Sequence, residues 1–300
     1  MKQRFWLASY PKSGNTWFRM LVANLHREHP VDINRLPPMP GIASLREPFD
    51  TLTLIASGLL THEECDLLRP AAYRAMARFE EIDPVGLEDG IADVVLAKTH
   101  DAWTLTAGGE PLLGGAAAAA GAILIVRDPR DIVASLASHN GESLGRTIDF
   151  MGDRRASFCG RNDRQDPQLR QQLLGWSDFN ASWLDQRDIP VHLVRYEEMQ
   201  ADAAGTLARA LAFAGVAISM ETAALAARFA RFDSLKAQEL KGGFAEAPRP
   251  HAGGNFFRSG IAGGWRDELA PGQAACLEAG HAAMMARLGY EPGEKTRKCA

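Results

Sequence analysis

The segment over residues 5–17 constrains the fold of this chain more than any other stretch. An apolar run, Phe5–Ala8, ends shortly before Pro11-Lys12-Ser13-Gly14, and an amphipathic pattern with helical spacing starts directly afterwards at Trp17. This order predicts a strand, a tight loop and a helix. The first N–H groups of a helix lack intrahelical partners and, with the helix dipole, favour an anion. We therefore expect the loop to bind a phosphate-bearing ligand.

Three further apolar runs predict strands of the same sheet, namely 94–97, 122–126 and 191–194. Continuous apolar strands separated by helical patterns are typical of a parallel sheet that is covered on both faces. The sequence thus predicts an α/β fold, with a mostly parallel central sheet and helices on both faces, in a single domain over residues 1–300. Open α/β sheets bind ligands at the carboxyl ends of their strands. The polar side chains expected to converge there are Lys12, Lys98, His100, Arg127 and Tyr196.

Helices and loops follow from periodicity and from Gly and Pro content. Helices are predicted at roughly 16–28, 61–80, 129–138, 168–187, 202–214, 219–231 and 271–288, with Asp128-Pro129 as a helix start. Irregular residues 30–60 and 139–167 are expected to form walls of a substrate pocket. A mobile loop at about 238–256, rich in Gly and Pro over 241–255, is expected to act as a lid, and 289–300 as a tail.

Bulk composition restricts the partners. With 33 Lys and Arg against 37 Asp and Glu, the net charge of −4 argues against a general nucleic-acid binder. No stretch is long and apolar enough for a transmembrane segment, and the start lacks a signal-peptide pattern, so a cytoplasmic protein is expected. The four cysteines show neither CxxC nor zinc spacing, which predicts reduced thiols and no metal site.

The first loop, Tyr10-Pro11-Lys12-Ser13-Gly14-Asn15-Thr16-Trp17, resembles the 5′-phosphosulfate loop of the sulfotransferases that use 3′-phosphoadenosine-5′-phosphosulfate (PAPS). The family form is YPKSGTTW, from which this chain departs at Asn15. It is not a Walker A loop, because GxxxxGK[ST] is absent. The residues that the resemblance assigns to the phosphosulfate end are Lys12, Ser13, Gly14, Asn15 and Thr16. The chain is thus identified as a bacterial member resembling the cytosolic-type sulfotransferases.

A second motif, Ile125–Ser135, resembles the 3′-phosphate site of the same family. An arginine fork binds phosphate through two parallel hydrogen bonds, which suits Arg127, and Ser135 lies two turns into the predicted helix. The alternative is a simple ion pair between Arg127 and Asp131.

A third motif, Phe256–Arg266, resembles the family's C-terminal signature RKGxxGxWK. The resemblance implies that Arg258, Ser259 and Gly260 bind phosphate, since glycine lets backbone amides approach an anion closely. Taken alone, the segment is equally a basic turn that packs a tryptophan.

The reacting centre is expected at Lys98-Thr99-His100, which resembles the family's KTH motif. The resemblance implies that His100 is the base and that Lys12 and Lys98 stabilise the leaving phosphate. A structural histidine at a strand end is the alternative.

The family resemblance also implies an adenine site. It assigns stacking to Trp17 and Phe232, and a hydrogen bond to the Tyr196 hydroxyl. Trp17 also lies on the apolar side of its predicted helix, so core packing is an alternative role.

The implied reaction is in-line transfer of a sulfuryl group from PAPS to a hydroxyl or amine of a small-molecule acceptor, leaving adenosine 3′,5′-bisphosphate (PAP) and needing no metal. An ATP-dependent P-loop kinase and a non-catalytic nucleotide-binding protein are the alternatives. Asp101, where the family often has an apolar residue, hints at a polar or cationic acceptor. A homodimer is left open, because the family's dimer motif is only faintly echoed after Trp265.

Overall fold

The computed structural model describes residues 3–34, 42–79, 91, 94–244, 246–247 and 255–293. The centre of the predicted lid, including 248–254, and residues 294–300 of the predicted tail lie outside this part of the chain.

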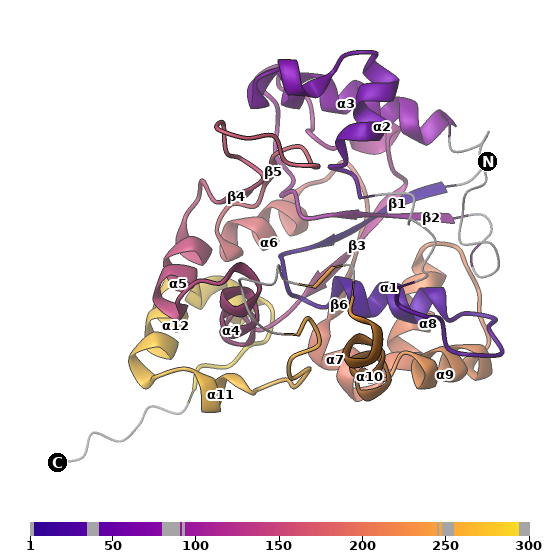
Figure 1. Ribbon diagram of the computed structural model, residues 1–300, viewed down its shortest axis with the longest axis vertical. Coiled ribbons are helices and arrows are strands. Elements are labelled where there is room, and N and C mark those ends of the chain that lie inside the picture. The colour runs from indigo at the N-terminus through magenta and orange to yellow at the C-terminus, as the bar shows by residue number, and fades with distance from the viewer. Residues whose placement is uncertain are drawn as a thin grey trace.

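Four parallel strands form the central sheet, as predicted. They are β1 (Gln3–Ser9), β2 (Val94–Thr99), β3 (Gly121–Val126) and β6 (Val191–Arg195), in the order β2-β1-β3-β6. Figure 1 shows these strands crossing the middle of the molecule, with helices around them. Ala8 is in register with Thr99, Ser9 with Ile125, and Val126 with Arg195. The carboxyl ends of all four strands therefore meet at one edge.

Each face of the sheet has its own apolar core, because successive side chains of a strand point to opposite faces. Trp6 and Ala8 belong to one core, and Phe5 and Leu7 to the other. The helices packed against the first core are α3 (His62–Phe79), α4 (Pro129–Asn140), α5 (Leu144–Gly152), α6 (Trp176–Asp185) and α12 (Pro271–Arg287). Those against the second are α1 (Asn15–Ala23), α7 (Tyr196–Ala201), α8 (Ala203–Phe213), α9 (Met220–Phe229) and α10 (Phe232–Gly242).

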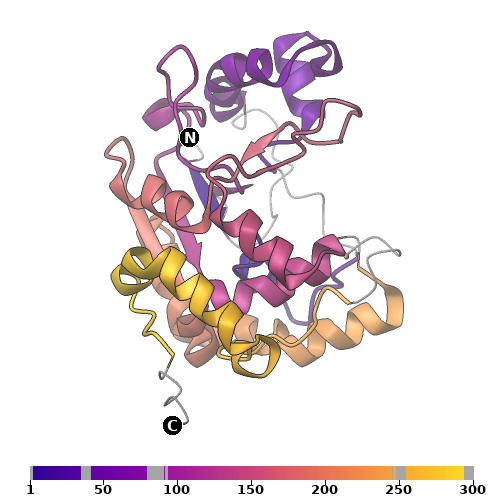
Figure 2. The ribbon, with the colours of Figure 1, turned by 90° about the vertical axis from the view of Figure 1, so that its left-hand side faces the viewer.

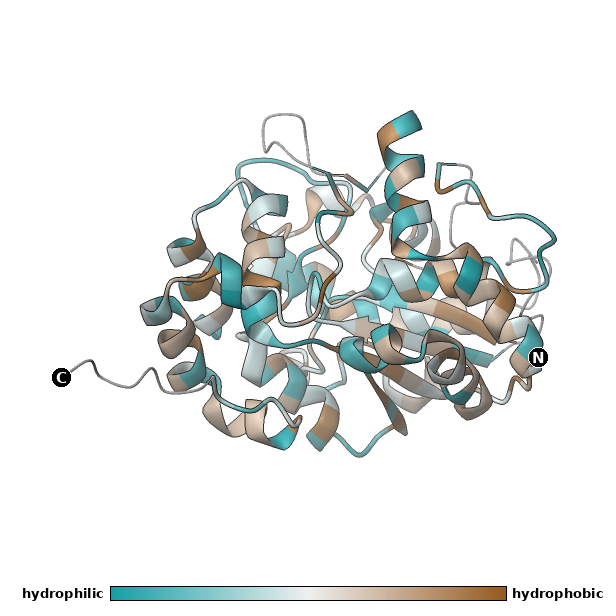
Figure 3. Ribbon diagram, turned by 90° about the horizontal axis from the view of Figure 1, so that it is seen from below, coloured by the Kyte–Doolittle hydropathy of each residue, from teal (hydrophilic) through white to brown (hydrophobic). Residues whose placement is uncertain are grey.

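The remaining elements are short. They are α2 (Arg46–Thr53), η1 (Ser57–Leu59), η2 (Gly115–Ala117), β4 (Ser157–Phe158), β5 (Gln171–Gln172) and α11 (Trp265–Glu268). The view in Figure 2 sets α2 and α3 apart from the helices at the lower part of the molecule. In Figure 3 the helices are banded hydrophilic and hydrophobic, as expected of helices that cover a sheet with one side.

Most predicted elements are confirmed, including the helix start at Asp128, whose side chain accepts from the Arg130 N–H. The prediction of a helix from 168 is wrong: β5 precedes α6, which begins at Trp176. The Gln172 N–H donates to Asp101 Oδ1 at 2.8 Å, and this bond keeps the segment extended. Residues 30–60 and 139–167, which were predicted to be irregular, also contain α2, β4 and α5. The predicted lid starts later than 238, because α10 continues to Gly242.

Two further observations concern the described residues only. None of their helices has the length and apolar character needed to cross a membrane. Cys65, Cys159 and Cys276 are free thiols, and Cys299 lies outside the described residues.

Candidate active site

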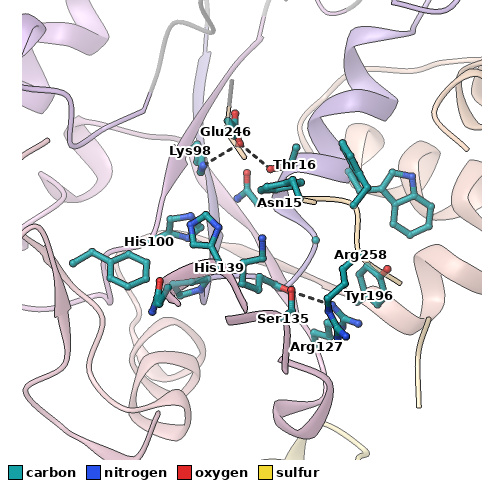
Figure 4. A pocket seen from close by; sticks show the side chains of 18 of the residues that line it. Asn15, Thr16, Lys98, His100, Arg127, Ser135, His139, Tyr196, Glu246 and Arg258 are labelled. Atoms are coloured by element: carbon teal, nitrogen blue, oxygen red, sulfur yellow. Dashed lines mark hydrogen bonds and ion pairs between the residues drawn. The ribbon is translucent and has the colours of Figure 1, made fainter. Parts of the chain in front are cut away.

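A cavity of about 620 Å³ lies at the carboxyl ends of the four strands. It is lined by every residue that the sequence analysis assigned to the site except Ser13. Figure 4 shows these side chains arriving from separate strand ends and loops. The Ser13 side chain is fully buried, and its hydroxyl has no hydrogen-bond partner among the described residues. The predicted convergence of distant segments is therefore present in the structure.

The first loop has an unusual backbone that brings it close to the cavity. Lys12 has φ +66° and Gly14 φ +106°, the left-handed region that non-glycine residues seldom adopt. A Cβ on Gly14 would lie 2.6 Å from the Tyr196 ring, so only glycine fits. Asn15 Nδ2 donates to Leu7 O at 3.0 Å and to Ser9 Oγ at 3.2 Å, which fixes the loop to the end of β1.

Two lysines and one glutamate dominate the charge at this loop. Burial, followed by the charge of Lys98, lowers the pKa of Lys12 to about 7, and burial also lowers the pKa of Lys98. Glu246 Oε1 accepts from Arg19 at 2.6 Å, while its Oε2 accepts from Thr16 at 3.0 Å and lies 3.8 Å from Lys98 Nζ. Burial opposes ionisation of Glu246, but the charges of Lys98 and Arg19 outweigh it and bring its pKa to about 2. A carboxylate thus neutralises part of the cationic field that the loop creates.

His100 follows β2 and is oriented by the end of β1. Its Nδ1 lies 2.7 Å from Ser9 O. Because a carbonyl oxygen only accepts, Nδ1 carries the proton and Nε2 keeps its lone pair. Burial and the charge of Lys98 lower the pKa of His100 to about 3, so the ring is neutral at physiological pH. This is the protonation state that a general base requires.

Arg127 lies at the end of β3 and keeps its charge free of carboxylates. It donates to Lys12 O at 3.3 Å and Ile261 O at 3.2 Å, and its guanidinium lies 4.2 Å from the centre of the Tyr196 ring. Within the part of the chain that the structure describes, no carboxylate forms an ion pair with it. Asp131 instead accepts from the N–H groups of Gly263 and Trp265. The alternative of an Arg127–Asp131 pair is therefore not observed.

The C-terminal motif contributes a second arginine and a second glycine. Arg258 forms two hydrogen bonds to Glu268, at 2.8 and 2.7 Å. Gly260 has φ +65°, and a Cβ there would lie 2.3 Å from the Phe232 ring. Trp265 is buried in the core, so the motif packs a tryptophan and also lines the cavity.

The predicted adenine residues also line the cavity, with two differences in detail. The Tyr196 hydroxyl donates to Gly260 O at 3.0 Å, which ties it to the C-terminal motif. Trp17 is half-buried, and its Nε1 donates to Ala230 O at 2.9 Å. Its ring lies edge-on to Tyr196 at 5.6 Å between centroids. Trp17 therefore combines partial packing with exposure to the cavity.

Asp101 gives no support to the expectation of a polar or cationic acceptor. This side chain is fully buried, forms an ion pair with Arg69 at 2.5 Å, and is not among the residues that line the cavity. Its role is to anchor the segment after His100 to α3 and β5.

Sequence reasoning missed His139 and Glu246. His139 lies one helical turn after Ser135 and lines the cavity, and its buried Nδ1 has no hydrogen-bond partner in the described part of the chain. Burial, followed by the charges of Lys12 and Lys98, lowers its pKa to about 4. The helix start at Pro129 could have placed His139 on the same side as Ser135. No local signal identifies Glu246, which reaches the loop only through tertiary packing.

Comparison with known proteins identifies the family of this chain. Residues 118–289, more than half of the chain, match the family described as "Sulfotransferase domain". The chain belongs to the sulfotransferase domain family. The matched residues include Arg127, Ser135 and Arg258. The match begins after His100, so it does not cover Lys12, Lys98 or His100 of this sulfotransferase-family chain.

The relatives agree with the assignment. Human sulfotransferase 2B1 is 25% identical over 182 residues, which are 58% of this chain and 46% of that protein. The chain thus spans about half the length of this curated relative. Mouse sulfotransferase SULT7A1 complexed with PAP has a similar fold, with a TM-score of 0.55, 19% identity, and coverage of 95% of this chain and 84% of that one. Retinol dehydratase in a complex with retinol and PAP gives a TM-score of 0.54, 17% identity, and 95% and 82% coverage.

Proposed function

We propose that this chain transfers a sulfuryl group from PAPS to a hydroxyl or amine of a small-molecule acceptor. The observation that carries the proposal is the meeting of Lys12, Lys98 and a neutral His100 in one cavity. The two lysines come from different strand ends, and each has a lowered pKa because it is buried near other cations. Buried cations of this kind are stabilised when an anion arrives. Membership of the sulfotransferase domain family supports the same conclusion.

The residues present fit a nucleotide with phosphate at both ends. Gly14 and Gly260 let their loops pack closely against Tyr196 and Phe232 at the edge of the cavity, where any larger residue would collide. Arg127 is free of carboxylates among the described residues and can bind a phosphate with its fork. Trp17 and Phe232 line the space between these points and supply aromatic faces for a base.

PAPS would supply the activated sulfuryl group, with a phosphate oxygen as the leaving atom. His100 Nε2 would accept the proton of the acceptor hydroxyl while the acceptor oxygen bonds to sulfur and the bond from sulfur to the phosphate oxygen breaks. Lys12 and Lys98 would stabilise the charge that collects on the departing oxygen, because buried cations act strongly where water is excluded. The products are the sulfated acceptor and PAP.

The proposal is tested by thermal-shift titration with PAP beside ATP–Mg²⁺. A true ligand at about 100 times its Kd stabilises the folded protein by about 2.7 kcal/mol. We expect stabilisation by PAP at concentrations where ATP–Mg²⁺ has little effect. A preference for ATP–Mg²⁺ would instead support a kinase, and no response to either nucleotide would refute the proposal.

A further inference from the structure

The cavity has a second wall, distinct from the cationic groups that would hold the nucleotide, and this wall is rich in uncharged hydrogen-bonding groups. It comes from the end of α4 and from the segment that contains β4 and β5. The polar residues that line it are His139, Asn140, Arg164, Asp166, Gln168 and Gln171. Phe158 and Ile42 add an aromatic and an aliphatic surface.

This wall is held next to His100 by backbone hydrogen bonds. The Ala102 N–H donates to Gln172 O at 2.7 Å, so β5 runs alongside the residues that follow His100. Phe158 of β4 is paired with Gln171 of β5. The polar wall is therefore positioned where the acceptor of a transfer at His100 would lie.

One buried polar atom of the wall has no partner among the described residues, and two amides beside it keep hydrogen-bonding capacity. Gln171 is only 3% exposed, and its Nε2 donates to Gln168 Oε1 at 3.0 Å. Gln168 Oε1 also accepts from Ser44 Oγ at 2.7 Å. The Gln171 side chain also hydrogen-bonds to Cys159, while Gln168 is half-buried. Each amide has four hydrogen-bonding positions, so both keep capacity for a ligand. His139 Nδ1 is the buried atom, and no described residue bonds to it.

The charges of the wall cancel. Arg164 Nε lies 3.4 Å from Asp166 Oδ1, so the two side chains form an ion pair and still expose donors and acceptors. A charged acceptor would gain little electrostatic attraction from such a pair, which favours a neutral acceptor. An apolar acceptor would leave the amide and imidazole groups of the wall unpaired, which is unfavourable. A neutral molecule with several hydroxyl groups satisfies both conditions, because a hydroxyl both donates and accepts.

We propose that the acceptor is a neutral polyhydroxylated molecule such as a sugar, and that His139 and Gln171 select it by hydrogen bonding to its hydroxyl groups. This inference rests on the proposed function. The Phe158 ring offers an apolar face for the carbon skeleton of such an acceptor, while one hydroxyl is presented to His100.

The test uses the full chain, radiolabelled PAPS and three classes of acceptor: neutral hexoses and polyols, simple phenols, and androsterone. PAP binding is measured first, since its absence would refute the proposed function and not the acceptor class in particular. With PAP binding present, we expect kcat/KM for the best hexose or polyol to exceed that for the phenols and androsterone by at least about 100-fold. Equal or better use of a phenol or of androsterone would overturn the inference. So would a protein that binds PAP but transfers to no member of the polyol class.

Two variants test the assigned residues. Gln171→Leu and His139→Phe each remove one hydrogen-bonding group from the wall and keep a similar side-chain volume. We expect each to raise KM for the polyol about tenfold while PAP affinity stays within about twofold. Gln165→Leu is the matched control, because Gln165 is exposed and outside the cavity lining. Unchanged KM in both wall variants, with PAP binding intact, would overturn the assignment.

Discussion

The two ends of the cavity are built in different ways. The end that would hold the nucleotide consists of short, contiguous motifs at strand ends, with cations and with glycines at positive φ. The opposite wall is assembled from α4, β4 and β5 and contains mainly amides and an ion pair. At the nucleotide end, the fixed geometry of a phosphate group restricts which residues can bind it. The polar wall lies outside the central sheet, so its residues can vary between members of one fold family without disturbing the sheet.

The largest effect is expected where the two ends meet. His100→Ala should reduce the rate of sulfuryl transfer by about 10²–10⁴-fold, because the acceptor loses its base. Affinity for PAP, measured by calorimetry, should be retained. Normal turnover by this variant would show that His100 is a structural residue of the strand end.

At the nucleotide end, Gly260→Ala should weaken PAP binding by about 10- to 100-fold. The new Cβ would collide with the Phe232 ring and would also sit at positive φ, a combination that costs about 1–3 kcal/mol. Gly264→Ala is the matched control, since the nearest atom to its Cβ would be 3.7 Å away. Equal PAP affinity in both variants would contradict the assignment of Gly260 to the nucleotide end. A change only in the KM for the acceptor would contradict it as well.

Glu246→Gln should strengthen PAP binding by about tenfold at low salt, with a smaller gain at high salt. The carboxylate bonds to Thr16 and lies near Lys98, two cavity-lining groups that an incoming anion would otherwise contact. Calorimetry at two ionic strengths measures the effect, with the exposed Glu142→Gln as control. Weaker binding would mean that Glu246 organises the loop and does not compete with the ligand.

The smallest effect is a pH dependence. Lys12, with a pKa lowered to about 7, loses its charge as the pH rises, so PAP affinity should fall several-fold between pH 6.5 and pH 9. Acidification from pH 7 to pH 5 should not protonate His100, because its pKa is about 3. Lys12→Met should flatten the alkaline decline in PAP affinity, whereas the exposed Lys241→Met should not. A decline that persists in Lys12→Met would assign it to another group.

The contrast between the two ends also explains what the sequence could predict. Lys12, His100 and Arg127 were predictable because each stands at the end of an apolar run, and parallel strands bring such ends together. Glu246 was not, since it contacts Thr16 across 230 positions of sequence. The burial of Asp101 was not predictable either, because the buried Arg69 that pairs with it cannot be recognised from composition.

The sequence predicted only part of the polar wall. Residues 139–167 were expected to line a pocket, and part of this segment does, but β5 was predicted as helix. Its extended form depends on hydrogen bonds from Gln172 to Asp101 and from Ala102 to Gln172. Such long-range bonds override local preference and leave no periodic pattern to detect.

The central position of β1 has a consequence for synthesis of the chain. Of the four strands of the sheet, β1 leaves the ribosome first. Its neighbour β2 begins only at Val94, and its other neighbour β3 ends at Val126. At about 5–20 residues per second, translation leaves both edges of β1 unpaired for on the order of 10 s. During that interval the apolar Phe5–Ala8 run has no sheet to join, and a chaperone that captures hydrophobic segments would find it accessible.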